Sequence, residues 1–195
     1  MTKSVFIPAE AGSFPNYCRA LQAVGCKVSL CTDPARSCTC DGLLLPGGGD
    51  IANSLDETER RLIQSFVDTR RRIFGICRGM QALNVWFGGT LHGHIPGHQL
   101  PKGDIIHPTR CIGLMKDLLG QTPTVNSNHH QAVDRLGRDL RTLQWTADGT
   151  IEAICHQSLP IWGVQWHPER QSFGLRRRDA VDASPLFYYF RSQLR

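Results

Sequence analysis

The apolar positions of residues 1–90 fall into two kinds of stretch. Short apolar runs at residues 5–7, 27–32, 42–45 and 73–76 have the length and composition of strands. Between them, apolar side chains recur at helical spacing over residues 16–24 and 57–72. Asn16 is placed to cap the first helix, and an acidic first turn and the arginines 70–72 mark the ends of the second. Strands that alternate with helices predict βαβ units around a parallel sheet.

The second half of the chain adds more strands and a final helix. Strands are predicted at residues 124–126, 140–145, 151–155 and 161–166, and the turn at 147–149 joins the middle two as a hairpin. Residues 90–108 are rich in histidine, glycine and proline, which indicates an irregular segment over a site. A last helix is predicted from Ser184, and its inward side chains are Leu186, Tyr189, Phe190 and Leu194.

The length and the element order together predict the fold class. With 195 residues, no internal repeat and no low-complexity linker, the chain is predicted to form one domain over residues 1–195. We expect an α/β three-layer sandwich around a central, mostly parallel sheet. Sites in such open sheets lie at the carboxyl ends of the strands.

The charge and the cysteine content indicate which partners and which compartment to expect. The net charge is +5, but the arginine runs at 70–72 and 176–178 lack interleaved aromatics, so they are interpreted as solvated surface and no nucleic-acid partner is predicted. The chain has neither an apolar leader nor a run long enough to cross a membrane, so we expect a cytoplasmic protein without a membrane partner. The eight cysteines are then expected to be free thiols, with a zinc site at residues 31, 38 and 40 as an alternative.

Cys77 stands between a predicted strand and a predicted helix with no loop on either side. Gly75 and Gly79 flank it, which indicates a sharp, crowded corner of the nucleophile-elbow kind. A thiol at a helix N-terminus favours the thiolate. The alternative interpretation is a small buried cysteine at a tight strand–helix junction.

His167 and Glu169 could supply the base that a cysteine nucleophile needs and the group that orients it. Residues two apart on an extended chain point the same way, so Glu169 can reach one imidazole nitrogen while the other faces the thiol. Pro168 stiffens the segment. A surface turn after a strand is the alternative.

Four stretches carry a family resemblance: 46–50 (Pro-Gly-Gly-Gly-Asp), 75–81 (Gly-Ile-Cys-Arg-Gly-Met-Gln), 126–131 (Asn-Ser-Asn-His-His-Gln) and 166–169 (Trp-His-Pro-Glu). Together they resemble the class I glutamine amidotransferase-like superfamily, which has a flavodoxin-like architecture. Within it, the chain is most similar to the gamma-glutamyl-gamma-aminobutyrate hydrolase branch, grouped with gamma-glutamyl hydrolases as cysteine peptidases.

The resemblance implies a mechanism and a set of site residues. Cys77, His167 and Glu169 would form a catalytic triad that cleaves a gamma-glutamyl amide through a thioester. The N–H groups of Gly48 and Arg78 would form the oxyanion hole, although which of residues 47–49 donates stays open. The implied substrate contacts are Gln81, Ser127, His129 and His130. For the two histidines, a structural pair that bonds backbone carbonyls is the alternative.

No metal and no cofactor is predicted. His92, His94, His98 and His107 are close in sequence, but their spacing matches no known ligand set, so they are interpreted as loop histidines near a cleft.

The predicted activity is hydrolysis of a small gamma-glutamyl compound. A glutaminase subunit that delivers ammonia to a partner synthase is the main alternative, and a redox sensor that uses Cys77 is a third. The segments 8–15 and 33–41 are short for the implied branch, which puts gamma-aminobutyrate itself in doubt as the leaving group. The expected partner is the small-molecule substrate, and the sequence leaves a homodimer open.

Overall fold

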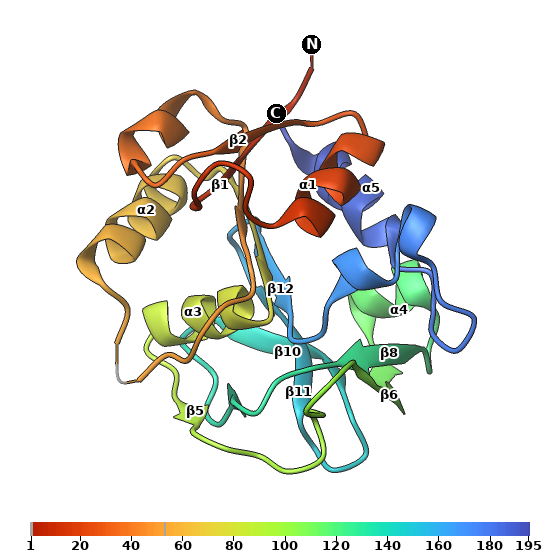
Figure 1. Ribbon diagram of the computed structural model, residues 1–195. Helices are drawn as coiled ribbons and strands as arrows, with labels where there is room; N and C mark the ends of the chain where they lie inside the picture. Colours follow the sequence, from red (N-terminus) through yellow and green to blue (C-terminus); the bar gives the residue numbers. More distant parts are fainter. Residues whose placement is uncertain (1, 53) are drawn as a thin grey trace.

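A single eight-stranded sheet runs through the computed structural model, which describes residues 2–52 and 54–195 (Figure 1). Its strand order is β2-β1-β3-β4-β12-β11-β10-β7. The five strands of the parallel half are β1 (Ser4–Ile7), β2 (Lys27–Leu30), β3 (Gly42–Leu45), β4 (Arg72–Ile76) and β12 (Ile161–Val164). The antiparallel half consists of β7 (Arg110–Cys111), β10 (Leu140–Trp145) and β11 (Ile151–His156). The predicted α/β class with a mostly parallel central sheet is confirmed.

Helices cover both faces of the sheet (Figure 1). On one face lie α2 (Glu57–Asp68) and α3 (Arg78–Trp86), and on the other lie α1 (Pro15–Ala23), α4 (Gly113–Leu119) and α5 (Ser184–Gln193). Side chains alternate along each strand, so Leu43 and Leu45 contribute to the core under α2 and α3, while Leu44 contributes to the core under α1 and α5. This alternation produces the three layers.

Two small sheets hold the histidine-rich segment in place. β6 (Ile105–Pro108) pairs antiparallel with β8 (Thr124–Ser127), and β5 (Leu91–His92) pairs with β9 (Ala132–Val133). The segment predicted as irregular therefore contains two short strands. Three 3-10 turns complete the elements: η1 (Pro34–Thr39), η2 (Pro168–Arg170) and η3 (Phe173–Leu175).

Some element ends differ from the sequence prediction. Helix α1 starts at Pro15 and not after a cap at Asn16, because proline is well suited to the first helical position. Helix α2 ends at Asp68, and Arg70 adopts a positive φ of 51°, so the arginine run links α2 to β4 and does not close the helix. In α5, Phe187 is fully buried, whereas Tyr189 is only partly so.

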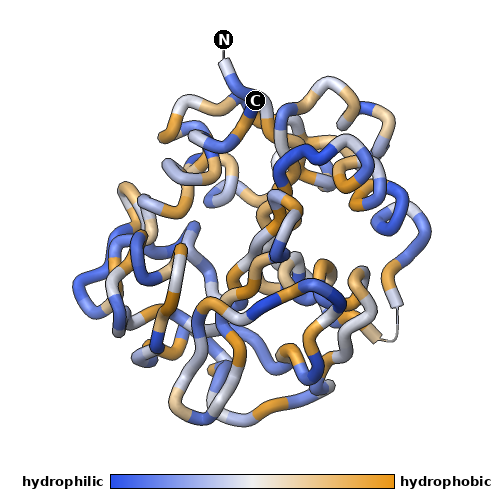
Figure 2. The backbone as a smooth tube through the Cα atoms, turned by 180° about the vertical axis from the view of Figure 1, so that it is seen from behind, coloured by the Kyte–Doolittle hydropathy of each residue, from blue (hydrophilic) through white to orange (hydrophobic). Residues whose placement is uncertain are grey.

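Hydrophobic segments run through the middle of the molecule, and hydrophilic ones lie mostly at its outer turns (Figure 2). Both chain ends lie at the same end of the molecule in the two views. Across the described residues, no helix combines the length and the apolar character that a membrane crossing requires.

Candidate active site

Cys77 occupies a strained corner between β4 and α3. It is the N-cap of α3, with φ 54° and ψ −111°, a backbone conformation that non-glycine residues rarely adopt. A Cβ added at Gly75 would lie 2.6 Å from the carbonyl oxygen of Gly79, and one added at Gly79 would overlap the carbonyl oxygen of Leu45. The two flanking glycines therefore allow backbones to touch, as the sequence predicted for an elbow.

The second half of the site follows β12, the strand beside β4. The Cys77 N–H donates to the carbonyl oxygen of Val164 at 2.8 Å, which ties the elbow to the strand that leads to His167. His167 and Glu169 are buried, and the imidazole Nδ1 lies 2.8 Å from Glu169 Oε1. Nε2 is therefore the ring nitrogen left to face the thiol.

The thiol and the imidazole meet beside Gly47. A Cβ added at Gly47 would lie 3.1 Å from His167 Cε1 and 3.7 Å from Cys77 Cβ. The two side chains, ninety residues apart in sequence, thus lie at one place in the fold. Glycine suits this position because an added Cβ would crowd the imidazole and would lie 2.9 Å from the Tyr17 hydroxyl.

Electrostatics keep His167 protonated. Burial alone would lower the pKa of its imidazole, but the Glu169 carboxylate and the hydrogen bond with Cys77 outweigh burial and raise the pKa to about 10. An imidazolium beside the Cys77 sulfur can give a proton to a leaving group. This arrangement can supply both a nucleophile and a proton donor.

Tyr17 on α1 connects the imidazole to the glycine loop. Its hydroxyl lies 3.4 Å from His167 Nδ1 and accepts the Gly47 N–H at 3.0 Å. Burial, followed by the charges of Glu169 and Cys77, raises the pKa of this phenol well above its usual value, so it stays neutral. Since the Gly47 N–H is already bonded, Gly48 is the better placed of the two to donate to an oxyanion.

Arg78, the first residue of α3, packs against the same glycine loop. Its guanidinium makes two bonds to Glu59 on α2, Nη1–Oε1 at 2.6 Å and Nη2–Oε2 at 2.9 Å. Its Cδ would lie 2.9 Å from a Cβ at Gly48. Within residues 2–52 and 54–195, no hydrogen bond uses the backbone N–H of Gly48 or Arg78.

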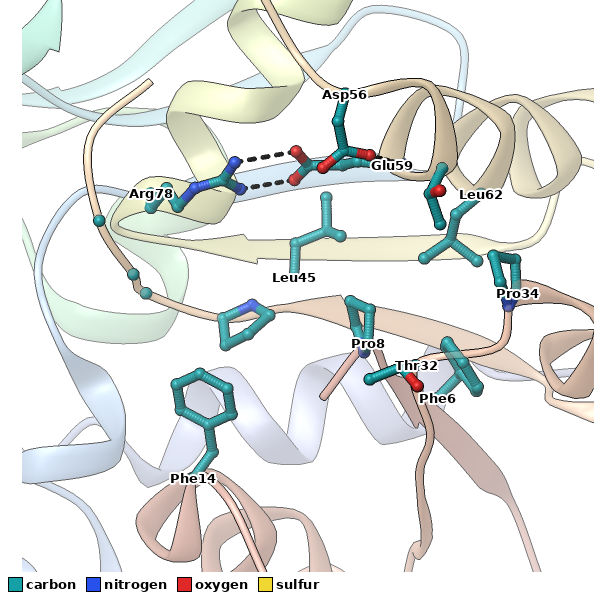
Figure 3. Close-up of a pocket in the computed structure, with 15 residues that line it drawn as sticks. Phe6, Pro8, Phe14, Thr32, Pro34, Leu45, Asp56, Glu59, Leu62 and Arg78 are labelled. Carbon is teal, nitrogen blue, oxygen red and sulfur yellow. Dashed lines mark hydrogen bonds and ion pairs between the residues drawn. The ribbon is translucent and has the colours of Figure 1, made fainter. Parts of the chain in front are cut away.

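A cavity of about 450 Å³ borders the glycine loop (Figure 3). Residues 47–49 and Arg78 form one wall, but neither Cys77 nor His167 lines it, so the cavity lies beside the sulfur and does not contain it. Most of its other walls are apolar. They are formed by Phe6, Pro8, Phe14, Pro34, Leu45 and Leu62. Asp56 and Glu59 add carboxylates near the Arg78 end.

Comparisons with known proteins identify the family of the chain. The Peptidase C26 family model matches residues 35–169, a stretch that begins before β3 and ends at Glu169. The chain belongs to the Peptidase C26 family. This match confirms the class I glutamine amidotransferase-like superfamily that the resemblance implied.

Three curated relatives illustrate the family. A Mycobacterium tuberculosis protein provisionally named a glutamine amidotransferase is 37% identical over 144 residues, which cover 66% of this chain and 46% of the relative. Protein NtpR of Enterococcus hirae is 33% identical over 161 residues, covering 66% of each. A protein of Methanospirillum hungatei named as one of the subunits of glutamine-hydrolysing GMP synthase is 33% identical over 131 residues, covering 67% of this chain and 64% of the relative. The match thus spans between about half and two thirds of their lengths.

A solved structure with low sequence identity shows the fold and nothing more. A Thermoplasma acidophilum structure, provisionally titled as one of the GMP synthase subunits, matches with a TM-score of 0.74 at 19% identity, covering 98% of this chain and 94% of that one.

The four substrate contacts implied by the resemblance to the gamma-glutamyl hydrolase branch are differently placed, and none of them lines the cavity. Gln81 is buried, and its amide donates to the carbonyl oxygen of Gln131 at 2.9 Å and to Gln165 Oε1 at 3.1 Å. His130 is partly exposed, and its Nε2 lies 2.9 Å from Asp50 Oδ1. These two contacts with substrate stay predictions.

Ser127 and His129 are buried in a separate polar cluster. The Ser127 hydroxyl donates to the carbonyl oxygen of His98 at 2.8 Å, and His129 Nδ1 bonds the carbonyl oxygen of Gln131 at 2.9 Å. The second bond is the backbone bond that the alternative interpretation of His129 describes. Their contact with substrate also stays a prediction.

Sequence reasoning missed three residues that position the triad. Nothing in the sequence pattern of its amphipathic helix distinguishes Tyr17 as a site residue. Asn126 receives the His167 N–H on its Oδ1 and donates from its Nδ2 to the His167 carbonyl oxygen, both at 2.8 Å. Gln165 Nε2 lies 3.7 Å from Cys77 Sγ. A polar amide inside the apolar run predicted as a strand at 161–166 was the available signal for Gln165.

Proposed function

We propose that this enzyme is a cysteine hydrolase that cleaves the gamma-glutamyl amide bond of a small compound through a thioester. One observation carries the proposal: the Cys77 elbow and the His167–Glu169 pair meet beside Gly47. Membership of the Peptidase C26 family supports the hydrolytic chemistry.

The reaction begins when the Cys77 thiolate attacks the side-chain carbonyl carbon of the glutamyl group. The N–H groups of Gly48 and Arg78 donate hydrogen bonds to the carbonyl oxygen, on which negative charge develops, and each such donor is typically worth about 10²–10³ in rate. The C–N bond then breaks, the electron pair leaves with nitrogen, and His167 gives its proton to the departing amine. A glutamyl thioester remains on Cys77.

Water completes the cycle. His167, now neutral, takes a proton from water as the oxygen attacks the thioester carbon. A second oxyanion forms and collapses, the C–S bond breaks, and glutamate leaves while the thiolate and imidazolium are restored. Glu169 stabilises the imidazolium at both stages, since its carboxylate bonds Nδ1 at 2.8 Å.

The cavity beside the glycine loop supports a leaving group larger than ammonia. Its volume of about 450 Å³ lies in the range of small-ligand pockets. Among the described residues, the only guanidinium on its walls is that of Arg78, which is already paired with Glu59, and Asp56 adds a further carboxylate. An apolar or cationic amine fits these walls better than an anionic one such as gamma-aminobutyrate.

A panel of gamma-glutamyl compounds tests the proposal. Purified protein is incubated with gamma-glutamyl alkylamines, a gamma-glutamyl diamine, gamma-glutamyl-gamma-aminobutyrate and glutamine, and release of glutamate is followed by mass spectrometry. We expect turnover of the alkylamine and diamine compounds, abolished in Cys77→Ala and kept in the control Cys38→Ser, whose thiol is exposed and remote in sequence. No release from any gamma-glutamyl compound would contradict the proposal.

A glutaminase that serves a partner synthase is the second candidate, because the Methanospirillum hungatei relative is named as part of a glutamine-hydrolysing GMP synthase. This alternative expects glutamine to be the best substrate and a partner synthase to raise a low basal rate. Turnover of glutamine alone within the panel would favour it over the amine-releasing hydrolase.

A further inference from the structure

We propose that His98, His129 and Glu152 bind a divalent transition-metal ion of the zinc class. The three residues come from separate parts of the chain: the segment between β5 and β6, the loop after β8, and strand β11. Their metal-binding atoms lie within 4.8 Å of one another. No metal was predicted from the sequence, because the spacing of His92, His94, His98 and His107 matches no known ligand set.

The buried charge of Glu152 requires a partner. Glu152 is 0% exposed, and both of its carboxylate oxygens lack a hydrogen-bond partner among the described residues. Burying a carboxylate without compensation costs several kcal/mol. A cation at this position would supply that compensation.

The distances around Glu152 Oε1 fit a shared metal ion better than shared protons. His107 Nε2, His98 Nδ1 and His129 Nε2 lie 3.4, 3.5 and 3.7 Å from this oxygen. All three exceed the usual range of an N–H···O bond. A tetrahedral zinc ion with bonds of 2.0–2.2 Å places its ligand atoms about 3.3–3.6 Å apart.

Outer hydrogen bonds orient two of the imidazoles as metal ligands are usually oriented. His129 Nδ1 lies 2.9 Å from the carbonyl oxygen of Gln131, which can only accept, so Nδ1 carries the proton. In the neutral ring, the lone pair of Nε2 therefore faces the Glu152 carboxylate. On His98, Nε2 lies 3.0 Å from Asp148 Oδ2, which leaves Nδ1 facing the centre. A carboxylate or carbonyl behind each ligating histidine is the common second shell of zinc.

Two of these nitrogens lie near the carboxylate without a hydrogen bond to any described residue. Within the described residues, His129 Nε2 and His107 Nε2 are buried atoms without a hydrogen-bond partner. Lone pairs directed at a carboxylate repel it, and a bound cation converts that repulsion into ligation. A metal-free imidazolium cluster is the competing arrangement, and the experiment below distinguishes the two.

The site would be structural. Its ligands His98, His129 and Glu152 are 0–4% exposed, so little room remains for a substrate on the metal. The ion would join the histidine-rich segment to β11 and to the loop after β8. Asn126, which holds His167, directly precedes Ser127 and lies on the same strand, β8, so the metal would support the active site through its backbone.

Metal content tests the inference without any substrate. The untagged wild-type chain is unfolded with a chelator, refolded and titrated with Co²⁺ and Zn²⁺. We expect one equivalent bound, a tetrahedral Co²⁺ spectrum without a sulfur charge-transfer band, and a Tm about 5–10 °C higher with zinc than without. The absence of the sulfur band distinguishes this site from binding by the eight cysteines.

Variants locate the ion. Glu152→Gln and His129→Gln should lose the bound equivalent, whereas the control His92→Gln, at an exposed histidine beside Asp134, should keep it. Cys77→Ala should also keep it, so failure of the hydrolase proposal and failure of this one are separable. If the buried variants do not fold, the wild-type stoichiometry and spectrum still decide. Binding below a tenth of an equivalent, or a spectrum with sulfur ligation, would overturn the proposal.

Discussion

Two clusters of ionisable side chains are buried in the described part of the chain, and the distances between their charged groups differ. In the Cys77 cluster, the imidazole and its carboxylate are 2.8 Å apart, a direct charge-assisted hydrogen bond. In the Glu152 cluster, three imidazoles surround one carboxylate oxygen at 3.4–3.7 Å. The shorter distance suits two groups that share a proton, and the longer distances suit groups that ligate one metal ion. The distance between buried charged groups therefore indicates whether a proton or a metal ion lies between them.

The surrounding backbone differs as well. Around Cys77, the glycines bring two chain segments into contact, and an added Cβ at Gly75 or Gly79 would meet backbone atoms. In the histidine-rich segment, a Cβ added at Gly93 or Gly97 would meet nothing within 4 Å. The reactive corner is therefore held by backbone packing, whereas the other cluster depends on side chains brought together from distant segments.

The largest expected effect distinguishes the role of the Glu169 carboxylate from that of the Glu152 carboxylate. Glu169→Gln should lower the turnover of a gamma-glutamyl amide by about 10²–10⁴ with little change in Tm, because the carboxylate orients and charges His167. Glu152→Gln should instead lower the Tm measured in the presence of zinc by about 5–10 °C, because the variant no longer binds the ion. Steady-state rates and thermal unfolding of both variants measure this contrast. Equal losses of activity and of stability in the two variants would show that the two carboxylates do not have different roles.

The pH dependence of Glu169→Gln sharpens the same contrast. The pKa of His167 is raised from 6.5 to about 10, so the imidazolium is retained through neutral pH and lost as the pH rises through 10. The wild-type rate should therefore hold to about pH 9 and fall above it. Without the carboxylate, the pKa of the imidazole falls and the alkaline limb moves to lower pH. An unshifted limb in the kcat/KM profile would show that Glu169 does not act on His167.

The Cys77 corner should tolerate an added methyl group less well than the histidine-rich segment. Gly79→Ala would place a methyl group against the Leu45 carbonyl and should cost about 3 kcal/mol or more of unfolding free energy. The matched control Gly93→Ala has free space and should change stability by less than about 0.5 kcal/mol. Urea unfolding of the two variants measures the difference. Similar midpoints would refute the account of the elbow.

The smallest expected effect concerns Tyr17. In Tyr17→Phe, the buried Gly47 N–H loses its acceptor at a cost of about 1–3 kcal/mol, so the glycine loop is less well fixed. We expect kcat to fall about tenfold while the alkaline limb of the pH profile keeps its position. Steady-state kinetics check this, and a variant with unchanged kcat would remove Tyr17 from the positioning of the loop.

The sequence predicted what is encoded locally. The Cys77 corner, the His167–Glu169 pair and the alternation of strands with helices each depend on neighbouring residues, and each appears in the structure. Helix α4 was not predicted, because its seven residues carry too short an apolar pattern to stand out.

Contacts over long sequence separations were not predictable in the same way. Tyr17 reaches His167 only because α1 and β12 are brought together by the sheet, and Glu152 meets His98 and His129 from across three segments. A single charged residue within the apolar strand β11 was the one local sign of that cluster. Its partners are set by tertiary structure and not by spacing along the chain.

The central claim is that the sulfur of Cys77 bonds covalently to the glutamyl group. The most direct measurement mixes the enzyme with a gamma-glutamyl anilide, quenches in acid during turnover and analyses the peptide that contains residue 77 by mass spectrometry. We predict a glutamyl adduct on Cys77 that hydroxylamine removes, at higher occupancy in Glu169→Gln if hydrolysis of the thioester slows more than its formation. Turnover that continues in Cys77→Ala, or an adduct on any other residue, would contradict the account.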